Sequence, residues 1–289
     1  MSEAEGAGAA QRPFRSELVF EETISEATLR AYHVGFDENA FRLKPLLDVI
    51  MSVLPEFAFG FHAGTVIPQS EIVNRLREAA STIYTTEEFR TRGEFGELIL
   101  HLLLRDWCNT VPLVSKIYFK DSVNVAVHGF DAVHVSSEGN TKTLWLGESK
   151  LYGDGFGGVK SLAKDVEAHM KGDYLRSEFS LISRRVPTDI PGREHWLTLM
   201  HNHQRLATIY QGVCIPAICT YTSPLFGSHK NKTEAYLQDF QKEIRELKET
   251  FDRANVRTDL EVLLMLLPVP SKDVLVAELD KRLRNAQDI

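Results

Sequence analysis

The chain has 289 residues, 43% of them hydrophobic, enough for one large domain or two small ones with a substantial core. Its formal net charge of −7 argues against bulk electrostatic binding of nucleic acid, although a local basic groove is compatible with it. Because no apolar run reaches bilayer-spanning length and no signal-peptide pattern opens the chain, we expect a soluble, cytoplasmic protein.

The chain contains three cysteines, Cys108, Cys214 and Cys219. They lack the paired spacing of a zinc site, and their odd number leaves at least one without a disulfide partner. We therefore expect reduced, structural thiols, as is usual in the cytoplasm.

Residues 1–13 are small and polar without a periodic apolar face, which predicts a disordered tail. Residues 14–91 are expected to form an N-terminal cap region. Within it, 29–36 is strand-like, an apolar helical pattern ends near Pro55, and Ser70 is a candidate cap of a second helix. The region carries no catalytic pattern, so it either completes the core or offers a docking surface.

Residues 92–289 are expected to form the core, with a helix-strand-helix extension at the C-terminal end. The core opens with an apolar helix whose first turn contains Glu94 and Glu97, where the helix dipole favours negative charge. The two glutamates lie on nearby but different parts of the helix surface. A strand is predicted at 115–119.

Residues 129–151 predict a β-hairpin that bears charges. Asp131 lies in its first strand, and Glu148 and Lys150 lie in its second. Because side chains alternate along a strand, Glu148 and Lys150 share one face. A carboxylate is costly to bury in an apolar sheet unless a cation compensates it.

Carboxylates that converge from neighbouring strands suit Mg²⁺ or Mn²⁺, with the carbonyl between Glu148 and Lys150 as a third oxygen ligand. Such a metal would polarise a phosphoryl oxygen and activate water, while Lys150 steadies the nucleophile or the developing charge. This pattern therefore indicates phosphodiester hydrolysis. The alternative is a solvated Glu-Lys pair with Asp131 near a turn, because Asp followed by Glu-x-Lys is a loose pattern.

A glycine-rich segment at 152–158 leads into a predicted helix at 159–170. It matches neither the phosphate-binding loop nor the dinucleotide pattern, so we expect no ATP site in this chain. Lys160 and Lys164, one turn apart near the hairpin charges, are candidates for contact with DNA phosphates. A solvated lysine face is the alternative.

Residues 189–208 are expected to be helical after a Pro-Gly break and include a literal His-Asn-His sequence. Nucleases named for that motif have the three residues dispersed over a ββα unit, so the adjacency carries no resemblance. His201 and His203 would face different sides of a helix, which argues against joint zinc ligation. We interpret them as polar-face residues, or as DNA contacts alongside Arg205.

The C-terminal part predicts a strand at 213–221, placed at an edge or a bulge by Pro216. An apolar stripe at 237–251 on a charged helix is our first candidate for a partner surface, with packing on its own domain as the alternative. A buried strand is predicted at 262–267. The last helix starts near Ser271 and is expected to turn these residues inward: Val274, Leu275, Leu279 and Leu283.

The order of elements over 92–222 resembles the PD-(D/E)xK nuclease superfamily. Three stretches are most similar to the HamA family, the nuclease subunit of the Hachiman anti-phage defence system. They read R-G-E-F-G-E-L-I-L-H-L-L-L, G-F-D-A-V-H-V and L-W-L-G-E-S-K-L-Y. The resemblance implies a restriction-endonuclease-like α/β fold, a mixed central sheet flanked by helices on an αβββαβ core. Phe130 stands where the motif's proline would be.

The resemblance also implies a role for the helix glutamate, which would join Asp131 and Glu148 at the metal while Lys150 assists the attack of water. We assign this role to Glu97, because the glycine beside it would permit close approach to the hairpin, and keep Glu94 as the alternative.

The function that the resemblance implies is a metal-dependent DNase acting with a separately encoded ATP-dependent helicase. The acidic chain agrees with a partner that delivers the DNA. The alternative is a non-catalytic binding or regulatory subunit of a helicase complex that keeps a nuclease-like fold. A chance match would leave the carboxylates apart in space.

Overall fold

The computed structural model describes residues 19–26, 28–60, 66–83, 93–114, 129–139, 141–254 and 261–289. The expected tail at 1–13 and the strand expected at 115–119 lie outside these residues. Both stay predictions.

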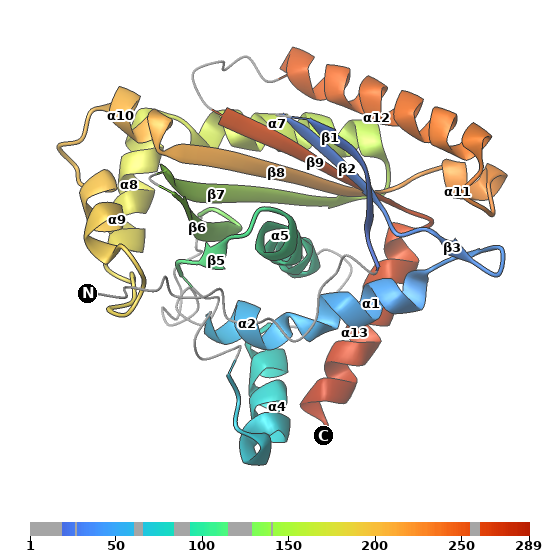
Figure 1. Cartoon of the computed structure of the whole chain (residues 1–289), viewed down its shortest axis with the longest axis horizontal. Coiled ribbons are helices and arrows are strands. Elements are labelled where there is room, and N and C mark those ends of the chain that lie inside the picture. Colours follow the sequence, from blue (N-terminus) through green and yellow to red (C-terminus); the bar gives the residue numbers. More distant parts are fainter. Residues whose placement is uncertain are drawn as a thin grey trace, which may run out of the picture.

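A seven-stranded sheet forms the centre, in the order β1-β2-β9-β8-β7-β6-β5 (Figure 1). The strands are β1 Glu21–Glu26, β2 Leu29–His33, β5 Val111–Pro112, β6 Ala132–Glu138, β7 Thr141–Tyr152, β8 Val213–Thr222 and β9 Glu261–Val269. Strands β2, β9, β8 and β7 pair in parallel, whereas β1, β6 and β5 pair antiparallel with their neighbours. The predicted mixed sheet is confirmed.

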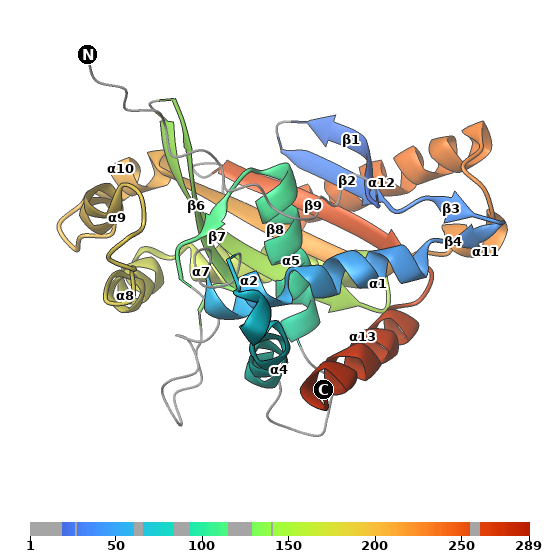
Figure 2. The same ribbon diagram turned by 60° about the horizontal axis from the view of Figure 1, so that its bottom comes forward.

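Helices cover both faces of the sheet (Figures 1 and 2). The helices are α1 Leu43–Ser52, α2 Leu54–Phe59, α4 Ile72–Ile83, α5 Glu94–Trp107, α7 Gly155–His169, α8 Gly172–Ser183, α9 Arg193–Leu199, α10 Leu206–Gln211, α11 Leu225–Ser228, α12 Glu234–Ala254 and α13 Lys272–Gln287. Helix α7 lies on one face of β7 and β8 with α12 packed over it, and α5 lies on the other face with α1 and α13 nearby. A short hairpin of β3 Phe36–Asp37 and β4 Ala40–Phe41 stands apart.

Alternation along β8 explains why its sequence is apolar throughout. Ala217 and Cys219 belong, with their odd-numbered neighbours, to the core under α7 and α12. Cys214 and Ile218 belong to the core shared by α1, α5 and α13. Both faces of a central parallel strand are covered, so a continuous apolar run is required. All three cysteines are free thiols, as expected.

The N-terminal region supplies part of the central sheet. Strand β2 pairs in parallel with β9, with Leu29 opposite Leu264, and β1 pairs with β2. Residues 21–33 therefore extend the sheet, while α1, α2 and α4 pack beneath it. The helix predicted to end near Pro55 ends at Ser52 as α1, and Pro55 lies in the first turn of α2. A 3₁₀ turn at Gln69–Glu71 precedes α4 and contains Ser70.

The prediction that Pro216 places its strand at an edge or a bulge is wrong. Strand β8 lies between β7 and β9. Its pairing with β7 stops after Trp145↔Cys214 and resumes at Glu148↔Ala217 with the same offset, so the register does not shift. This gap accommodates a residue that has no N–H to donate, while the pairing with β9 continues past Pro216.

The apolar stripe at 237–251 is not a partner surface. Phe240, Ile244 and Leu247 are completely buried, because α12 packs against α7. The expectation for the last helix holds for Leu275, Leu279 and Leu283 but is wrong for Val274, which is 50% exposed. Ser271 caps this helix by accepting a hydrogen bond from the Val274 N–H.

The glycine-rich segment is explained by packing. Helix α7 already begins at Gly155, after Asp154, whose carboxylate accepts a hydrogen bond from the Gly157 N–H. A Cβ at Gly158 would lie 2.4 Å from Cys219 Sγ, and one at Gly155 would lie 2.9 Å from the Tyr221 ring. Glycine therefore lets the helix approach β8. Among the described residues, no helix is long and apolar enough to cross a membrane.

Candidate functional site

The predicted hairpin is confirmed as β6 and β7. The strands pair from Ala132↔Gly147 to Glu138↔Thr141. Asp131 directly precedes β6, and its N–H donates to the Gly147 carbonyl at 2.9 Å. Asp131 therefore lies at the end of the hairpin ladder, beside Ser149 and near Glu148.

The carboxylate of Asp131 is fixed by Ser149. Its Oδ2 accepts hydrogen bonds from the Ser149 N–H and from the Ser149 hydroxyl, both at 2.8 Å. Burial and the charge of Glu148 raise the pKa of Asp131 to about 6, although Ser149 and Lys150 oppose the change. The charge of Glu148 is thus close enough to disfavour ionisation of Asp131.

Glu148 is 2% exposed, and its Oε1 is bonded to Nδ1 of His169 at the end of α7. Burial raises the pKa of Glu148, while the hydrogen bond and charge of His169 act against the rise. The bond to Glu148 raises the pKa of His169 in turn, which favours the imidazolium form beside the carboxylate. An uncompensated carboxylate at this depth would be costly, so His169 supports its ionised form.

Lys150 lies two residues further along the same face and forms an ion pair with Asp165 of α7. Burial lowers its pKa, but the bond and charge of Asp165, with help from Asp131 and Glu148, outweigh this and raise it. Two strand residues span about 6.6 Å, and four helix residues span about 6 Å. The spacing of Asp165 and His169 on α7 therefore matches that of Lys150 and Glu148 on β7, so that each helix residue pairs with one strand residue.

An aromatic group holds the His169 ring. Tyr174 of α8 stacks on it with centroids 4.6 Å apart and planes 4° apart. Phe130 meets its edge at 5.8 Å. The imidazole is therefore clamped in the orientation that faces Glu148. His169, Asp165 and Tyr174 are absent from the predicted site. The antiparallel docking of α7 on β7 reveals the first two, and the position of α8 reveals Tyr174.

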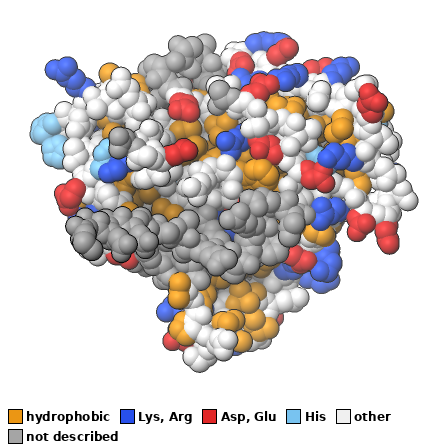
Figure 3. Space-filling view, in the orientation of Figure 1, with side chains coloured by type: hydrophobic (Ala, Val, Ile, Leu, Met, Phe, Trp, Pro, Cys, Tyr) orange, Lys and Arg blue, Asp and Glu red, His pale blue; other side chains and the backbone are white. Residues whose placement is uncertain are grey.

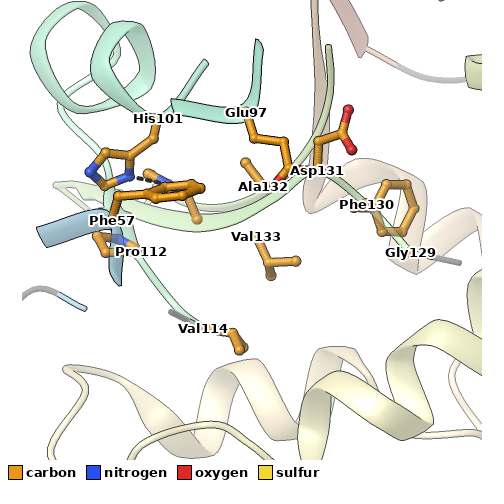
Figure 4. Close-up of a pocket in the computed structure, with 11 residues that line it drawn as sticks. Phe57, Glu97, His101, Pro112, Val114, Gly129, Phe130, Asp131, Ala132 and Val133 are labelled. Carbon is orange, nitrogen blue, oxygen red and sulfur yellow. Dashed lines mark hydrogen bonds between the residues drawn. The ribbon is translucent and has the colours of Figure 1, made fainter. Parts of the chain in front are cut away.

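Helix α5 approaches the hairpin from the other face of the sheet. A Cβ at Gly96 would lie 3.1 Å from Ser149 Oγ, and one at Gly147 would lie 2.7 Å from Leu100 Cδ2. The expected close approach at Gly96 is confirmed. Glu97, on the next position, lines a pocket together with Asp131 (Figure 4).

The pocket continues inward from Asp131 between α5 and β6. Its deeper wall contains His101 and His134, whose ring nitrogens lie 3.1 Å apart, and Phe57 packs edge-on against His101. Thr110 bonds the second nitrogen of His134 at 2.8 Å. These buried imidazoles belong to the packing between α5 and the hairpin.

The structure brings together Asp131, Glu148 and Lys150, and it places Glu97 beside Asp131. Within the described part of the chain, no three His, Cys, Asp or Glu side chains gather closely enough to be a metal centre by themselves. Lys160 and Lys164 are exposed on α7, and Lys164 adjoins Asp165. His201 and His203 lie between α9 and α10 and not on the single helix that was expected.

These features define an α/β protein with a charged hairpin site beneath a covering helix. The model of the HamA family matches residues 12–283, so the chain belongs to the HamA family. This agrees with the resemblance to the subunit of the Hachiman anti-phage defence system. No curated protein matches the chain.

Proposed function

We propose that the chain is a Mg²⁺-dependent DNase of the PD-(D/E)xK type, the cytoplasmic effector nuclease of an anti-phage defence complex that includes a separate helicase. The observation that carries the proposal is the convergence of Asp131, Glu148 and Lys150 at one end of the hairpin, where burial raises the pKa of both carboxyls and the charge of Glu148 raises that of Asp131 further. Membership of the HamA family supplies the defence context.

The donor set fits a hard divalent cation. Magnesium in proteins is commonly held by one or two carboxylates together with waters and substrate phosphate oxygens, so a third side chain is not required. Both hydrogen bonds from Ser149 end on Oδ2 of Asp131, and His169 engages Oε1 of Glu148. Oδ1 of Asp131 and Oε2 of Glu148 are the oxygens that would hold the ion. Two carboxylates that repel each other would gain from a cation placed between them.

Ser149 contributes to the same arrangement. Its N–H points toward Asp131. In a strand, the carbonyl of a residue points to the same side as its N–H, so the Ser149 carbonyl also faces the side where β6 begins. It is a candidate third oxygen ligand.

When bound, Mg²⁺ would polarise the scissile phosphate and lower the pKa of a coordinated water. Lys150 would hold the attacking water and the phosphoryl oxygen that gains charge. The water oxygen forms a bond to phosphorus, the bond from phosphorus to the 3′ oxygen breaks, and that oxygen takes up a proton. The products are a 5′ phosphate and a 3′ hydroxyl. His169 and Asp165 would fix the two groups that act on the substrate.

Glu97 is proposed as an additional carboxylate on the α5 side, where it shares the pocket with Asp131. Lys160 and Lys164 are proposed to contact DNA phosphates, a role supported by their exposure one turn apart on α7. A second candidate function is a non-catalytic subunit. The internal pairing of Glu148 with His169 and of Lys150 with Asp165 favours it, because structural ion pairs also perturb pKa values.

The test is cleavage of plasmid and linear DNA with Mg²⁺ or Mn²⁺, with and without a candidate helicase and ATP. Wild type should cut, and Glu148→Ala and Lys150→Ala should reduce cutting by at least about a hundredfold while remaining folded. Lys242→Ala, an exposed lysine on α12 distant from the site, is the matched control and should cut normally. If wild type is inactive under every condition, or the site variants cut as well as it does, the nuclease proposal is rejected and the chain is a non-catalytic subunit.

A further inference from the structure

A hollow surface lies on the α8–α9 side of the molecule, away from the hairpin charges. Two adjoining hollows of about 400 and 390 Å³ share Leu197, His201 and His203 in their walls. We call their union the α8–α9 groove. Its walls come from the end of α8, from α9 and from the following loop, and they include Arg184, Arg193, Glu194, Leu197, Met200 and His201.

The groove is basic in a chain that is acidic overall. Residues 171–212 contain six Lys and Arg against four Asp and Glu, whereas the whole chain contains 33 against 40. Arg184 is exposed at the wall, and Arg193 reaches it from the start of α9. The acid that lines it, Glu194, is 90% exposed in its side chain and lies 3.6 Å from Arg193. Histidine side chains gather on this side of the molecule (Figure 3).

A further cation borders the groove from the hairpin itself. A Cβ at Gly192 would lie 3.4 Å from Nζ of Lys142, so Lys142 reaches the start of α9. Burial lowers the pKa of His195 on α9, and the charge of Lys142 lowers it further. Positive charge from two separate parts of the chain therefore meets at this surface.

The groove is preformed. Arg176 of α8 donates hydrogen bonds to the carbonyls of Asn202 at 2.6 Å and Gln204 at 2.9 Å, which ties the loop that carries the histidines. The buried Trp196 anchors α9, because its Nε1–H donates to the Pro191 carbonyl at 3.0 Å. Nε of Arg193 is buried without a hydrogen-bond partner among the described residues, although its N–H is a strong donor.

The lining chemistry favours a phosphate backbone over a protein surface. Arginine, serine, threonine, asparagine and glutamine are the side chains that contact DNA phosphates, and all five types line the groove. A protein interface would need an apolar centre. Here Met200 is buried, and Leu197 is the partly exposed apolar contributor.

Helix α8 connects the groove to the hairpin site. Tyr174, near its start, stacks on the histidine that holds Glu148, and Arg184 follows its last residue. Ten residues of helix span about 15 Å, which corresponds to about four base-pair steps of 3.4 Å. One DNA molecule can therefore reach both places.

We propose that the α8–α9 groove binds the sugar-phosphate backbone of the DNA whose cleaved bond lies at the hairpin, with Arg184 and Arg193 as its principal phosphate contacts. The inference rests on the proposed nuclease function, and it gives an acidic chain its own basic site for the substrate. Backbone binding of this kind is independent of sequence and falls with salt.

The test measures binding without cleavage. Fluorescence anisotropy would follow the full chain, in EDTA, on a labelled 30-nucleotide single strand and on the matching duplex. Arg184→Gln with Arg193→Gln should weaken binding about tenfold and flatten the plot of log affinity against log salt by about 0.7 to 0.9 per lost contact. Thermal unfolding should show both variants folded.

The matched control is Lys242→Gln with Arg253→Gln on α12, which removes the same charge elsewhere and should bind as wild type does. If the groove variant binds both DNA probes with wild-type affinity and salt slope, or if the control loses as much, the proposal is overturned. Because EDTA prevents metal-dependent cleavage, this result is separate from the nuclease test. A chain that binds DNA through the groove but never cuts would reject the proposed function and leave the groove intact.

Discussion

Replacing Asp131 by asparagine is expected to stabilise the metal-free protein near neutral pH. Burial and the charge of Glu148 raise the pKa of Asp131 from 3.8 to about 6. Between those two pH values the folded state binds more protons than the unfolded state, so stability falls as pH rises through this window. Above pH 6 the full cost of holding a charged carboxylate is present.

The size of this effect follows from the two pKa values. The difference between 3.8 and about 6 corresponds to at most about 3 kcal/mol of unfolding free energy. Part of it is shared with Glu148, so about 1 to 3 kcal/mol is the expected gain. Asparagine keeps an oxygen that can accept from Ser149 while removing the charge. At about 2 °C per kcal/mol for a chain of this size, Tm should rise by about 2 to 6 °C.

The assay is urea and thermal unfolding of wild type and Asp131→Asn in EDTA at pH 7.5 and at pH 4. The variant should be the more stable protein at pH 7.5, and the gap should close at pH 4. Added Mg²⁺ should stabilise wild type alone, because a ligand stabilises only the state that binds it. The exposed Asp37→Asn is the control for loss of a negative charge. A variant that is less stable at pH 7.5, or equally shifted at both pH values, would refute the reasoning.

Three further changes test the surroundings of the site. Gly147→Ala should lower the unfolding free energy, measured in urea, by about 1 to 3 kcal/mol, because its Cβ would lie 2.7 Å from a leucine of α5. An unchanged urea midpoint would mean that α5 can shift. His169→Ala should weaken metal binding by about 10- to 100-fold in a Mn²⁺ titration. His169→Gln should recover part of this loss, because its amide can still donate to Glu148. Equal losses of Mn²⁺ affinity in the two variants would show that His169 does not position Glu148. Glu97→Gln should slow DNA cleavage, and Glu94→Gln should not; the reverse result would make Glu94 the helix carboxylate.

The hairpin and its charges were predictable because strand alternation is a local rule. Glu148 and Lys150 share a face by alternation, and the observed register brings Asp131, which directly precedes Ala132, to the same end of the hairpin. The glycine at position 96 also indicated a close helix, and the contact at Ser149 confirms it. Each of these inferences needs only neighbouring residues.

The groups that hold the charges could not be predicted in this way. His169 and Asp165 reach the hairpin because α7 runs antiparallel to β7 with matching spacing, a relation between elements that no local pattern contains. The prediction from Pro216 failed for a related reason. A gap in the hydrogen-bond ladder between β7 and β8 allows a proline inside the sheet, and the sequence of β8 alone does not reveal that gap. The apolar stripe on α12 is identical in sequence whether α7 or a partner covers it.

The central claim is that Asp131 and Glu148 hold a divalent cation and that Lys150 beside it assists the attack of water. Equilibrium binding of Mn²⁺ to the full chain, followed by the electron paramagnetic resonance of the free ion, tests it most directly. Wild type should bind Mn²⁺, and Asp131→Asn with Glu148→Gln should lose at least about tenfold in affinity. Lys150→Met should bind Mn²⁺ at least as tightly as wild type and fail to cut DNA. Equal Mn²⁺ affinity in wild type and the double variant would contradict the account.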